Sequence, residues 1–161
     1  MFRLLFISFL TLLSPVLLSC EKVPDLTIPD TLKEEQNQND PMPDRIKITV
    51  SGKTVSVLIE DNKATKALVA ALRESPITYE ADDYGGFEKV GSLGRSLPAS
   101  NNQITTQAGD VILYNGNQIV LFYGSNSWSY TRIGKMEYES LDELKSFLKA
   151  GQGKINVTLS L

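Results

Sequence analysis

Residues suited to ligand binding gather between Tyr123 and Arg132, where the sequence reads YGSNSWSYTR. Aromatic rings bind ligands by stacking, and a guanidinium group makes bidentate contacts with carboxylates. We therefore predict that this segment forms a pocket for a peptide, a protein or a small molecule. The alternative, to which we give more weight, is that Trp128 and Tyr130 fold back as lids on the barrel. The predicted pocket residues of this segment are Tyr123, Ser125, Asn126, Trp128, Tyr130 and Arg132.

Residues suited to acid–base, metal or nucleotide chemistry are scarce. The chain has no histidine, which removes the usual general base and the most frequent metal ligand. We interpret Asp82-Asp83 as a solvated loop rather than a metal site. No nucleotide, metal or catalytic-triad motif is present, so we predict no cofactor and no metal. From Ile46 onward there are twelve acidic and twelve basic residues, a balance that argues against binding to nucleic acid.

Residues 1–19 have the layout of a secretory signal peptide. Arg3 precedes an apolar run, and the small residue Ser19 lies directly before Cys20, the only cysteine. A membrane-spanning helix is the alternative, but it needs about 20 apolar residues, whereas this run is shorter and contains Pro15. The end of the run, LLSC, resembles the lipobox of bacterial lipoproteins. That resemblance implies acylation of Cys20 and anchoring in a lipid bilayer of the cell envelope, which we expect to be the outer membrane.

The segment from Glu21 to Asp44 contains four of the seven prolines and the polar run EEQNQND. It has too few large apolar side chains to offset the entropy lost on ordering, so we predict a disordered tether. Asp30-Thr31-Leu32 resembles a short O-glycosylation signal of some exported Bacteroidetes proteins. The predicted boundaries are 1–19 for the signal peptide, 20–45 for the lipidated cysteine and tether, and 46–161 for the folded domain.

Hydrophobic periodicity predicts a hairpin and a helix at the start of the folded domain. Apolar and polar residues alternate over 46–50 and again over 55–59, as expected of half-buried strands. A helix is predicted over 63–74, where apolar residues recur at helical spacing and Asp61 or Asn62 can cap the first turn. Pro76 disfavours helix at the residue before it and ends the element.

A second hairpin forms the centre of the predicted fold. Two apolar runs, Val111–Tyr114 and Ile119–Tyr123, flank Asn115-Gly116, a strong signal for a two-residue turn because both residues must take positive φ. Such a turn places Ile112 opposite Ile119. Neither strand alternates cleanly, so we expect both faces to be covered.

The remaining segments complete a mainly β domain. A short strand is predicted over 77–81, loops with short strands over 82–98, and a polar loop over 101–107. Ser140 and Glu143 match a capping box at the start of a second helix, and 154–161 alternates as a final strand. About eight short strands and two helices favour a closed or nearly closed barrel, which leaves no exposed strand edges.

Two segments resemble the bacterial cyclophilin-like domain family. They are Glu88–Gly94, followed by Leu97-Pro98, and Gly109–Met136. The resemblance extends over 46–161 and implies an eight-stranded cyclophilin-like β-barrel capped by two α-helices. Many members resemble exported lipoproteins, which agrees with the position of Cys20.

The resemblance does not transfer a catalytic residue. Cyclophilins use an arginine with a histidine, a glutamine and several aromatic residues around a proline pocket, whereas this chain lacks histidine and the Phe-x-x-Gln-Gly segment. We therefore favour a binding module without cyclophilin-type catalysis. The alternative is a peptidyl-prolyl isomerase acting on exported proteins, with Arg132 or Arg95 as the hydrogen-bond donor. Glu88 is predicted to belong to the ligand pocket and to form an ion pair with Arg132.

Overall fold

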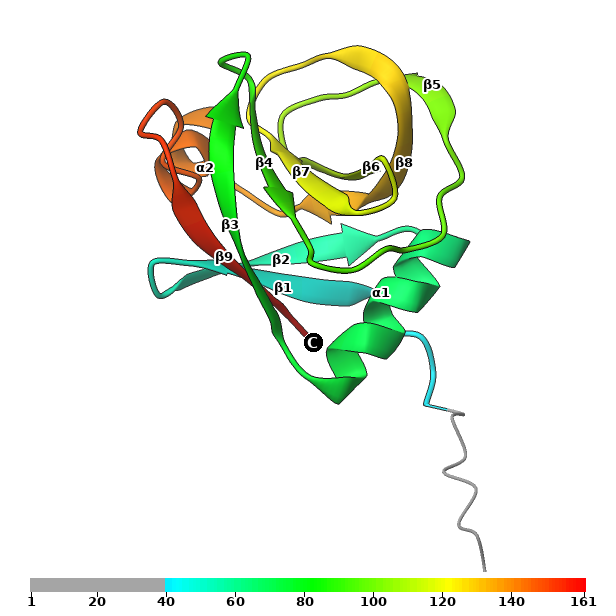
Figure 1. Ribbon diagram of the computed structural model, residues 1–161. Helices are drawn as coiled ribbons and strands as arrows, with labels where there is room; N and C mark the ends of the chain where they lie inside the picture. The colour runs from blue at the N-terminus through cyan, green and yellow to red at the C-terminus, as the bar shows by residue number, and fades with distance from the viewer. Residues whose placement is uncertain (1–39) are drawn as a thin grey trace, which may run out of the picture. The chain divides into compact units, whose positions relative to one another are not determined.

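A computed structural model describes residues 40–161, which form nine strands and two helices (Figure 1). Residues 1–39, which hold the predicted signal peptide, Cys20 and most of the predicted tether, lie outside the described residues. Within residues 40–161, no helix is both long enough and apolar enough to cross a membrane. The elements are β1 (Arg45–Val50), β2 (Lys53–Ile59), α1 (Lys63–Glu74), β3 (Ile77–Tyr84), β4 (Glu88–Ser92), β5 (Asn102–Thr105), β6 (Asp110–Tyr114), β7 (Gln118–Phe122), β8 (Ser127–Met136), α2 (Leu141–Phe147) and β9 (Ile155–Ser160).

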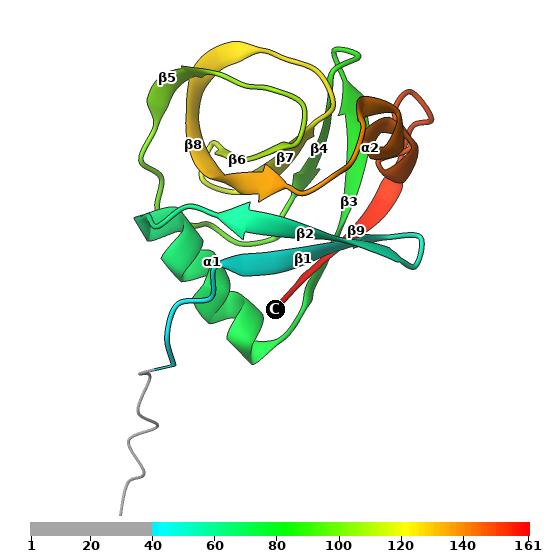
Figure 2. The same cartoon turned by 180° about the vertical axis from the view of Figure 1, so that it is seen from behind.

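Eight of these strands close into an antiparallel barrel in the order β2-β1-β9-β3-β4-β7-β6-β8. The barrel closes where Val57–Ile59 of β2 pairs with Gly134–Met136 of β8, as Figure 2 shows from the opposite side. Closure satisfies the backbone groups that an open sheet would leave unpaired at its edges. The predicted mainly β fold, an eight-stranded barrel with two helices, is therefore confirmed.

The two helices begin at side-chain caps that the sequence predicts. The side chain of Asn62 accepts a hydrogen bond from the Thr65 amide at 3.0 Å and caps α1. The Ser140 hydroxyl accepts from the Glu143 amide at 3.2 Å and caps α2. The Glu143 carboxylate reaches back to the amide of Glu139 at 2.7 Å rather than to that of Ser140. The capping box therefore forms with its return bond shifted by one residue.

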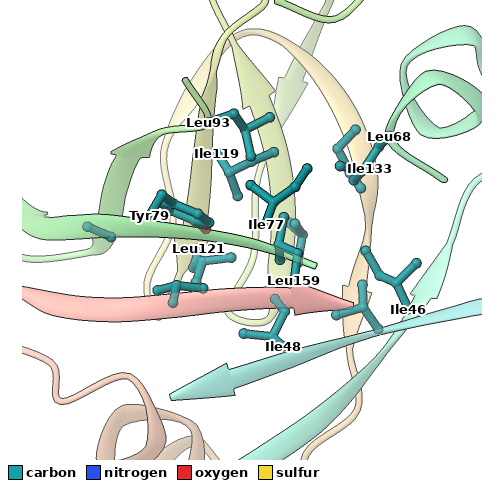
Figure 3. Packing of buried hydrophobic residues seen from close by; sticks show 14 of the residues in the cluster. Ile46, Ile48, Leu68, Ile77, Tyr79, Leu93, Ile119, Leu121, Ile133 and Leu159 are labelled. Atoms are coloured by element: carbon teal, nitrogen blue, oxygen red, sulfur yellow. The ribbon is translucent and has the colours of Figure 1, made fainter. Parts of the chain in front are cut away.

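The barrel interior is filled by alternate residues of the strands and by one face of each helix. Apolar side chains from strands distant in the sequence meet at the centre, as Figure 3 shows. Burying an aliphatic or aromatic side chain of this size contributes about 1.5–3 kcal/mol. This core holds the strands whose outer faces form the site described below. Labelled core residues in Figure 3 are Ile46, Ile48, Leu68, Ile77, Tyr79, Leu93, Ile119, Leu121, Ile133 and Leu159.

The central hairpin forms, but the predicted register is wrong by one residue. Asn115 and Gly116 both have positive φ, 50° and 72°, and the Tyr114 carbonyl accepts from the Asn117 amide as in a two-residue turn. Asn117 is nevertheless left out of the ladder between the two strands, because its carbonyl accepts from the Leu93 amide. Consequently Ile112 pairs with Val120 rather than with Ile119.

The outer face of this hairpin is also covered, as predicted. Beyond the barrel, β8 arches over β6 and β7, and β5 lies along it (Figure 1). The predicted polar loop over 101–107 is therefore wrong in part, since β5 pairs with the start of β8 and not with the barrel. Its sequence is polar because it is the outermost strand and exposed on most of its length. Under the arch lies a second apolar cluster, the outer cluster, made of Ile112, Val120, Phe122 and Tyr130.

Candidate functional site

A cavity of about 870 Å³ lies on the outer face of the barrel, between β4, β7 and the first half of β8. We call it the aromatic cavity because five of its eleven lining residues are aromatic. The strand faces around it carry side chains on alternate residues, so Glu88 and Val90 of β4 point to the same side. Its lining residues are Tyr84, Gly85, Phe87, Glu88, Val90, Tyr114, Gln118, Val120, Asn126, Trp128 and Tyr130.

Edge-to-face ring contacts set the shape of the cavity wall. Tyr130 packs edge-to-face on Phe122 with ring centroids 5.8 Å apart, and on Tyr114 with centroids 5.9 Å apart. The amide of Asn126 donates a hydrogen bond to the Tyr130 hydroxyl at 2.9 Å. The pKa of Tyr130 is raised, mainly because its phenol is buried. The indole of Trp128 is held less tightly, since the residue is 56% exposed while it lines the cavity.

Among residues 40–161, Glu88 is the only acidic residue in the lining of the aromatic cavity, and no lysine or arginine of this range lines it. The residue is only 5% exposed and lies opposite Phe122 of β7 and Tyr84 of β3. Its Oε2 atom is buried without any hydrogen-bond partner among the described residues. Burial raises the pKa of the Glu88 carboxyl to about 7, because a charged carboxylate is poorly solvated there. The group can therefore hold or release a proton near neutral pH.

The neighbouring lysine does not neutralise Glu88. Lys89 points to the opposite face of β4, is fully buried, and places its Nζ 2.8 Å from an Asp83 carboxylate oxygen. Lys89 also donates to the Gly153 carbonyl. Burial alone would raise the pKa of Asp83, but hydrogen bonds from Lys89, two backbone amides and a tyrosine hydroxyl lower it to about 2. The predicted solvated loop at Asp82-Asp83 is thus wrong, because both residues belong to β3.

The structure brings four of the predicted pocket residues together at the aromatic cavity: Glu88, Asn126, Trp128 and Tyr130. Two others point elsewhere. Tyr123 is buried, and its hydroxyl donates a hydrogen bond to Asp83 at 2.9 Å. Burial and the neighbouring Asp83 carboxylate raise the pKa of Tyr123 to about 12. The Ser125 hydroxyl donates to the Thr106 carbonyl at 2.7 Å and holds the loop before β8.

Arg132 lies away from the aromatic cavity, and the predicted ion pair with Glu88 is wrong. Its guanidinium contacts Glu60 at 3.7 Å and the buried Asp110 at 3.4 Å. It lines a smaller cavity of about 280 Å³ next to the start of α1. Arg95 is exposed and lines neither cavity. An isomerase reaction in the aromatic cavity would therefore have neither of the two arginines proposed as its donor.

Several cavity residues escaped the sequence reasoning because strand pairing brings them to the site. Val90 pairs with Val120, and Tyr114 belongs to the strand on the far side of β7. Alternation along β4 and β7 shows which residues share a face, but it does not show that β4 lies beside β7. Within residues 40–161, no group of three or more His, Cys, Asp or Glu residues is placed to hold a metal ion.

The closed eight-stranded barrel with two helices matches the architecture of a cyclophilin-like domain. The chain belongs to the cyclophilin-like family, whose model matches residues 48–160, in agreement with the resemblance seen in the sequence.

The fold is similar to that of solved structures of other proteins. The solution structure of the hypothetical protein AF2241 from Archaeoglobus fulgidus has 17% identity and a TM-score of 0.51, covering 76% of this chain and 98% of that one. The structure of McbB in complex with tryptophan has 14% identity and a TM-score of 0.53, covering 71% of this chain and 44% of that one. At these identities the likeness shows the fold alone. No curated protein matches the chain.

Proposed function

We propose that this protein is an exported, lipid-anchored module that binds a small ligand in the aromatic cavity. The observation that carries the proposal is the buried Glu88 carboxyl, whose Oε2 has no partner among the described residues and which lines that cavity. Buried polar atoms in native proteins nearly always have a hydrogen-bond partner. The carboxyl group lies in the wall of an open cavity and lacks a hydrogen-bond partner at the buried Oε2, so a polar ligand in the cavity can supply an interaction that the protein does not.

The size and lining of the cavity favour a small molecule over a protein surface. Ligand pockets have volumes of roughly 300–1,000 Å³ and are lined by apolar and aromatic groups with a few polar atoms. The aromatic cavity has a volume of about 870 Å³, and its polar side chains besides Glu88 and the tyrosines are Gln118 and Asn126. This composition fits a ligand with a flat apolar body and at least one polar group.

The site can be tested with the dye N-phenyl-1-naphthylamine, which is neutral and fluoresces in apolar surroundings. Trp128 is the only tryptophan of the chain and lines the cavity, so energy transfer from its indole reports on dye bound nearby. We expect saturable dye fluorescence with energy transfer, and loss of both in Tyr114→Ala, which removes a wall of the cavity.

Leu58→Ala is the matched control, because Leu58 is 48% exposed on β2 and lies outside the cavity. It should bind the dye as the unmodified protein does. Dye binding that survives Tyr114→Ala unchanged, or that shows no energy transfer from Trp128, would place the dye elsewhere and refute the proposed site.

The proposed anchoring rests on the lipobox-like LLSC segment that ends at Cys20. Each buried methylene of an acyl chain contributes about 0.8 kcal/mol, and more than one chain gives stable anchoring. We expect the protein to fractionate with membranes of the cell envelope and Cys20→Ala to be released from them. A Cys20→Ala variant that remains wholly in the membrane fraction would argue against acylation at this residue.

A further inference from the structure

In the part of the chain that the structure describes, the aromatic cavity presents a single carboxyl group and no basic side chain to its contents. Glu88 is the only acidic residue of the lining, and the other ionisable groups there are the phenols of Tyr84, Tyr114 and Tyr130. An anion entering the cavity would meet a negative group without a compensating cation. A buried carboxylate, in turn, costs free energy unless it is paired.

No cation among the described residues is available to pair with Glu88. Lys89 is committed on the opposite face of β4 to Asp83 and to a backbone carbonyl. Arg132 contacts Glu60 and Asp110 and lines the other, smaller cavity. When Glu88 is ionised, a counter-charge for its carboxylate can therefore come from what the cavity binds.

We infer that the ligand of the aromatic cavity is an organic cation, a protonated or quaternary amine carrying a flat apolar group, with Glu88 as its counter-ion. This inference rests on the proposed function and specifies its ligand class. The positive centre lies against the Glu88 carboxylate, while the apolar group packs among the rings.

The aromatic lining adds to the selection for a cation. The faces of aromatic rings carry partial negative charge and attract a cation placed over them, most strongly over tryptophan. The lining supplies Trp128 together with the rings of Tyr84, Phe87, Tyr114 and Tyr130. A neutral ligand of the same shape would bury the same apolar area but would leave the carboxylate without a partner.

Binding of a cation by Glu88 must depend on pH in a defined direction. Glu88 has a pKa of about 7 in the empty cavity, so it becomes a carboxylate as the pH rises through neutrality. The phenols that interact with it electrostatically belong to Tyr123, whose pKa is raised to about 12, and Tyr130, whose pKa is also raised. Between about pH 6 and pH 8 the carboxyl of Glu88 changes its charge, whereas the raised pKa values of Tyr123 and Tyr130 keep these two phenols neutral.

The inference is tested on the whole protein with three probes of matched size: the cation phenethylamine, the neutral 2-phenylethanol and the anion 3-phenylpropanoate. Affinity is measured by isothermal titration calorimetry, and occupancy is followed by the fluorescence of Trp128. We expect phenethylamine to bind at least about tenfold more tightly than the neutral probe, since one charge-assisted contact contributes about 1.5–3 kcal/mol. We expect 3-phenylpropanoate to bind most weakly.

Glu88→Gln should remove the advantage of the cation, bringing phenethylamine and 2-phenylethanol to within about twofold of each other. The control is Glu80→Gln on the neighbouring strand β3, because Glu80 lies outside the cavity and pairs with Lys154 at 2.7 Å. This control should leave the affinities for all three probes unchanged.

The pH dependence provides a second test that needs no variant. Benzyltrimethylammonium keeps its charge at every pH, so any change in its affinity reports on the protein. We expect binding about tenfold weaker at about pH 6 than at about pH 8, as follows from a carboxyl with a pKa near 7.

Two results would overturn the inference in distinguishable ways. Equal or tighter binding of 2-phenylethanol, unaffected by Glu88→Gln, would reject the cation while leaving a ligand-binding cavity in place. The inference would also be rejected if neither phenethylamine nor benzyltrimethylammonium binds while the protein still binds N-phenyl-1-naphthylamine beside Trp128. Loss of dye binding at the cavity as well would reject the proposed function itself.

Discussion

The buried carboxyl of Glu88 makes a quantitative prediction about stability. In the folded protein its pKa is about 7, whereas an exposed glutamate titrates near 4.5. The folded state therefore holds this proton over a range of pH in which the unfolded state has released it. The contribution of Glu88 to the free energy of unfolding is largest below about pH 4.5. It falls as the pH rises from about 4.5 to about 7 and is lowest above about pH 7.

The size of the effect follows from the same two pKa values. A difference of one pH unit in pKa corresponds to about 1.36 kcal/mol, so the shift of Glu88 amounts to about 3 kcal/mol. Glu88→Gln removes the titrating group but keeps its shape. The difference in unfolding free energy, variant minus unmodified protein, should increase by about 3 kcal/mol as the pH rises from about 4.5 to about 8.

The assay is urea unfolding of both proteins, followed by circular dichroism at the two pH values. The quantity to compare is the change with pH in the difference of unfolding free energies between the two proteins. The cost of burying the glutamine amide is present at both values and cancels, as do all other titrating groups. A difference that stays constant to within about 0.5 kcal/mol would refute the burial of an unpaired carboxyl at this position.

Three further substitutions test the fold around the site. Gly134→Ala should destabilise the barrel by about 1–3 kcal/mol, because a Cβ atom would lie 2.3 Å from the Leu58 carbonyl oxygen where β8 meets β2; an unchanged thermal midpoint would contradict this. Asp83→Asn should cost about 3–5 kcal/mol by leaving the buried Lys89 without its partner, and adding Lys89→Met should recover much of the loss in urea unfolding; a double variant no more stable than the single one would count against the pair. Gly116→Val should cost about 1 kcal/mol or more, since Gly116 has a φ of 72°, and equal melting curves would refute the strained turn.

Short-range patterns predicted most of the elements of the fold. The helix over 63–74, its Asn62 cap and the positive φ of Asn115 and Gly116 depend on residues within one turn or one hairpin of each other. The predictions that were wrong depend on distant partners. Asn117 does not pair within the hairpin because its carbonyl accepts a hydrogen bond from the Leu93 amide. Strand β5 forms because it pairs with the start of β8.

For the candidate site, too, the sequence predicted what depends on neighbouring residues and missed what depends on distant ones. Trp128, Tyr130 and Asn126 stood out because aromatic and amide residues are concentrated in one short segment. Arg132 belongs to the same segment, yet it lines a different cavity, where its guanidinium contacts Asp110 and Glu60. Proximity in sequence therefore pointed to the arched strand β8 as part of the candidate site without showing which of its residues face the cavity.

The sequence by itself indicated the family through two segments that resemble it, while local periodicity and turn chemistry favoured a closed or nearly closed barrel and composition singled out the segment around Trp128. Only the tertiary structure decided what surrounds Glu88. The pairing of β4 with β3 and β7, and the arch of β8, place its carboxyl among aromatic rings and leave Oε2 unpartnered among the described residues. The burial of Glu88, and the lack of a cation beside it within residues 40–161, are properties of several strands together. No stretch of sequence contains them, and they are what give the aromatic cavity its chemistry.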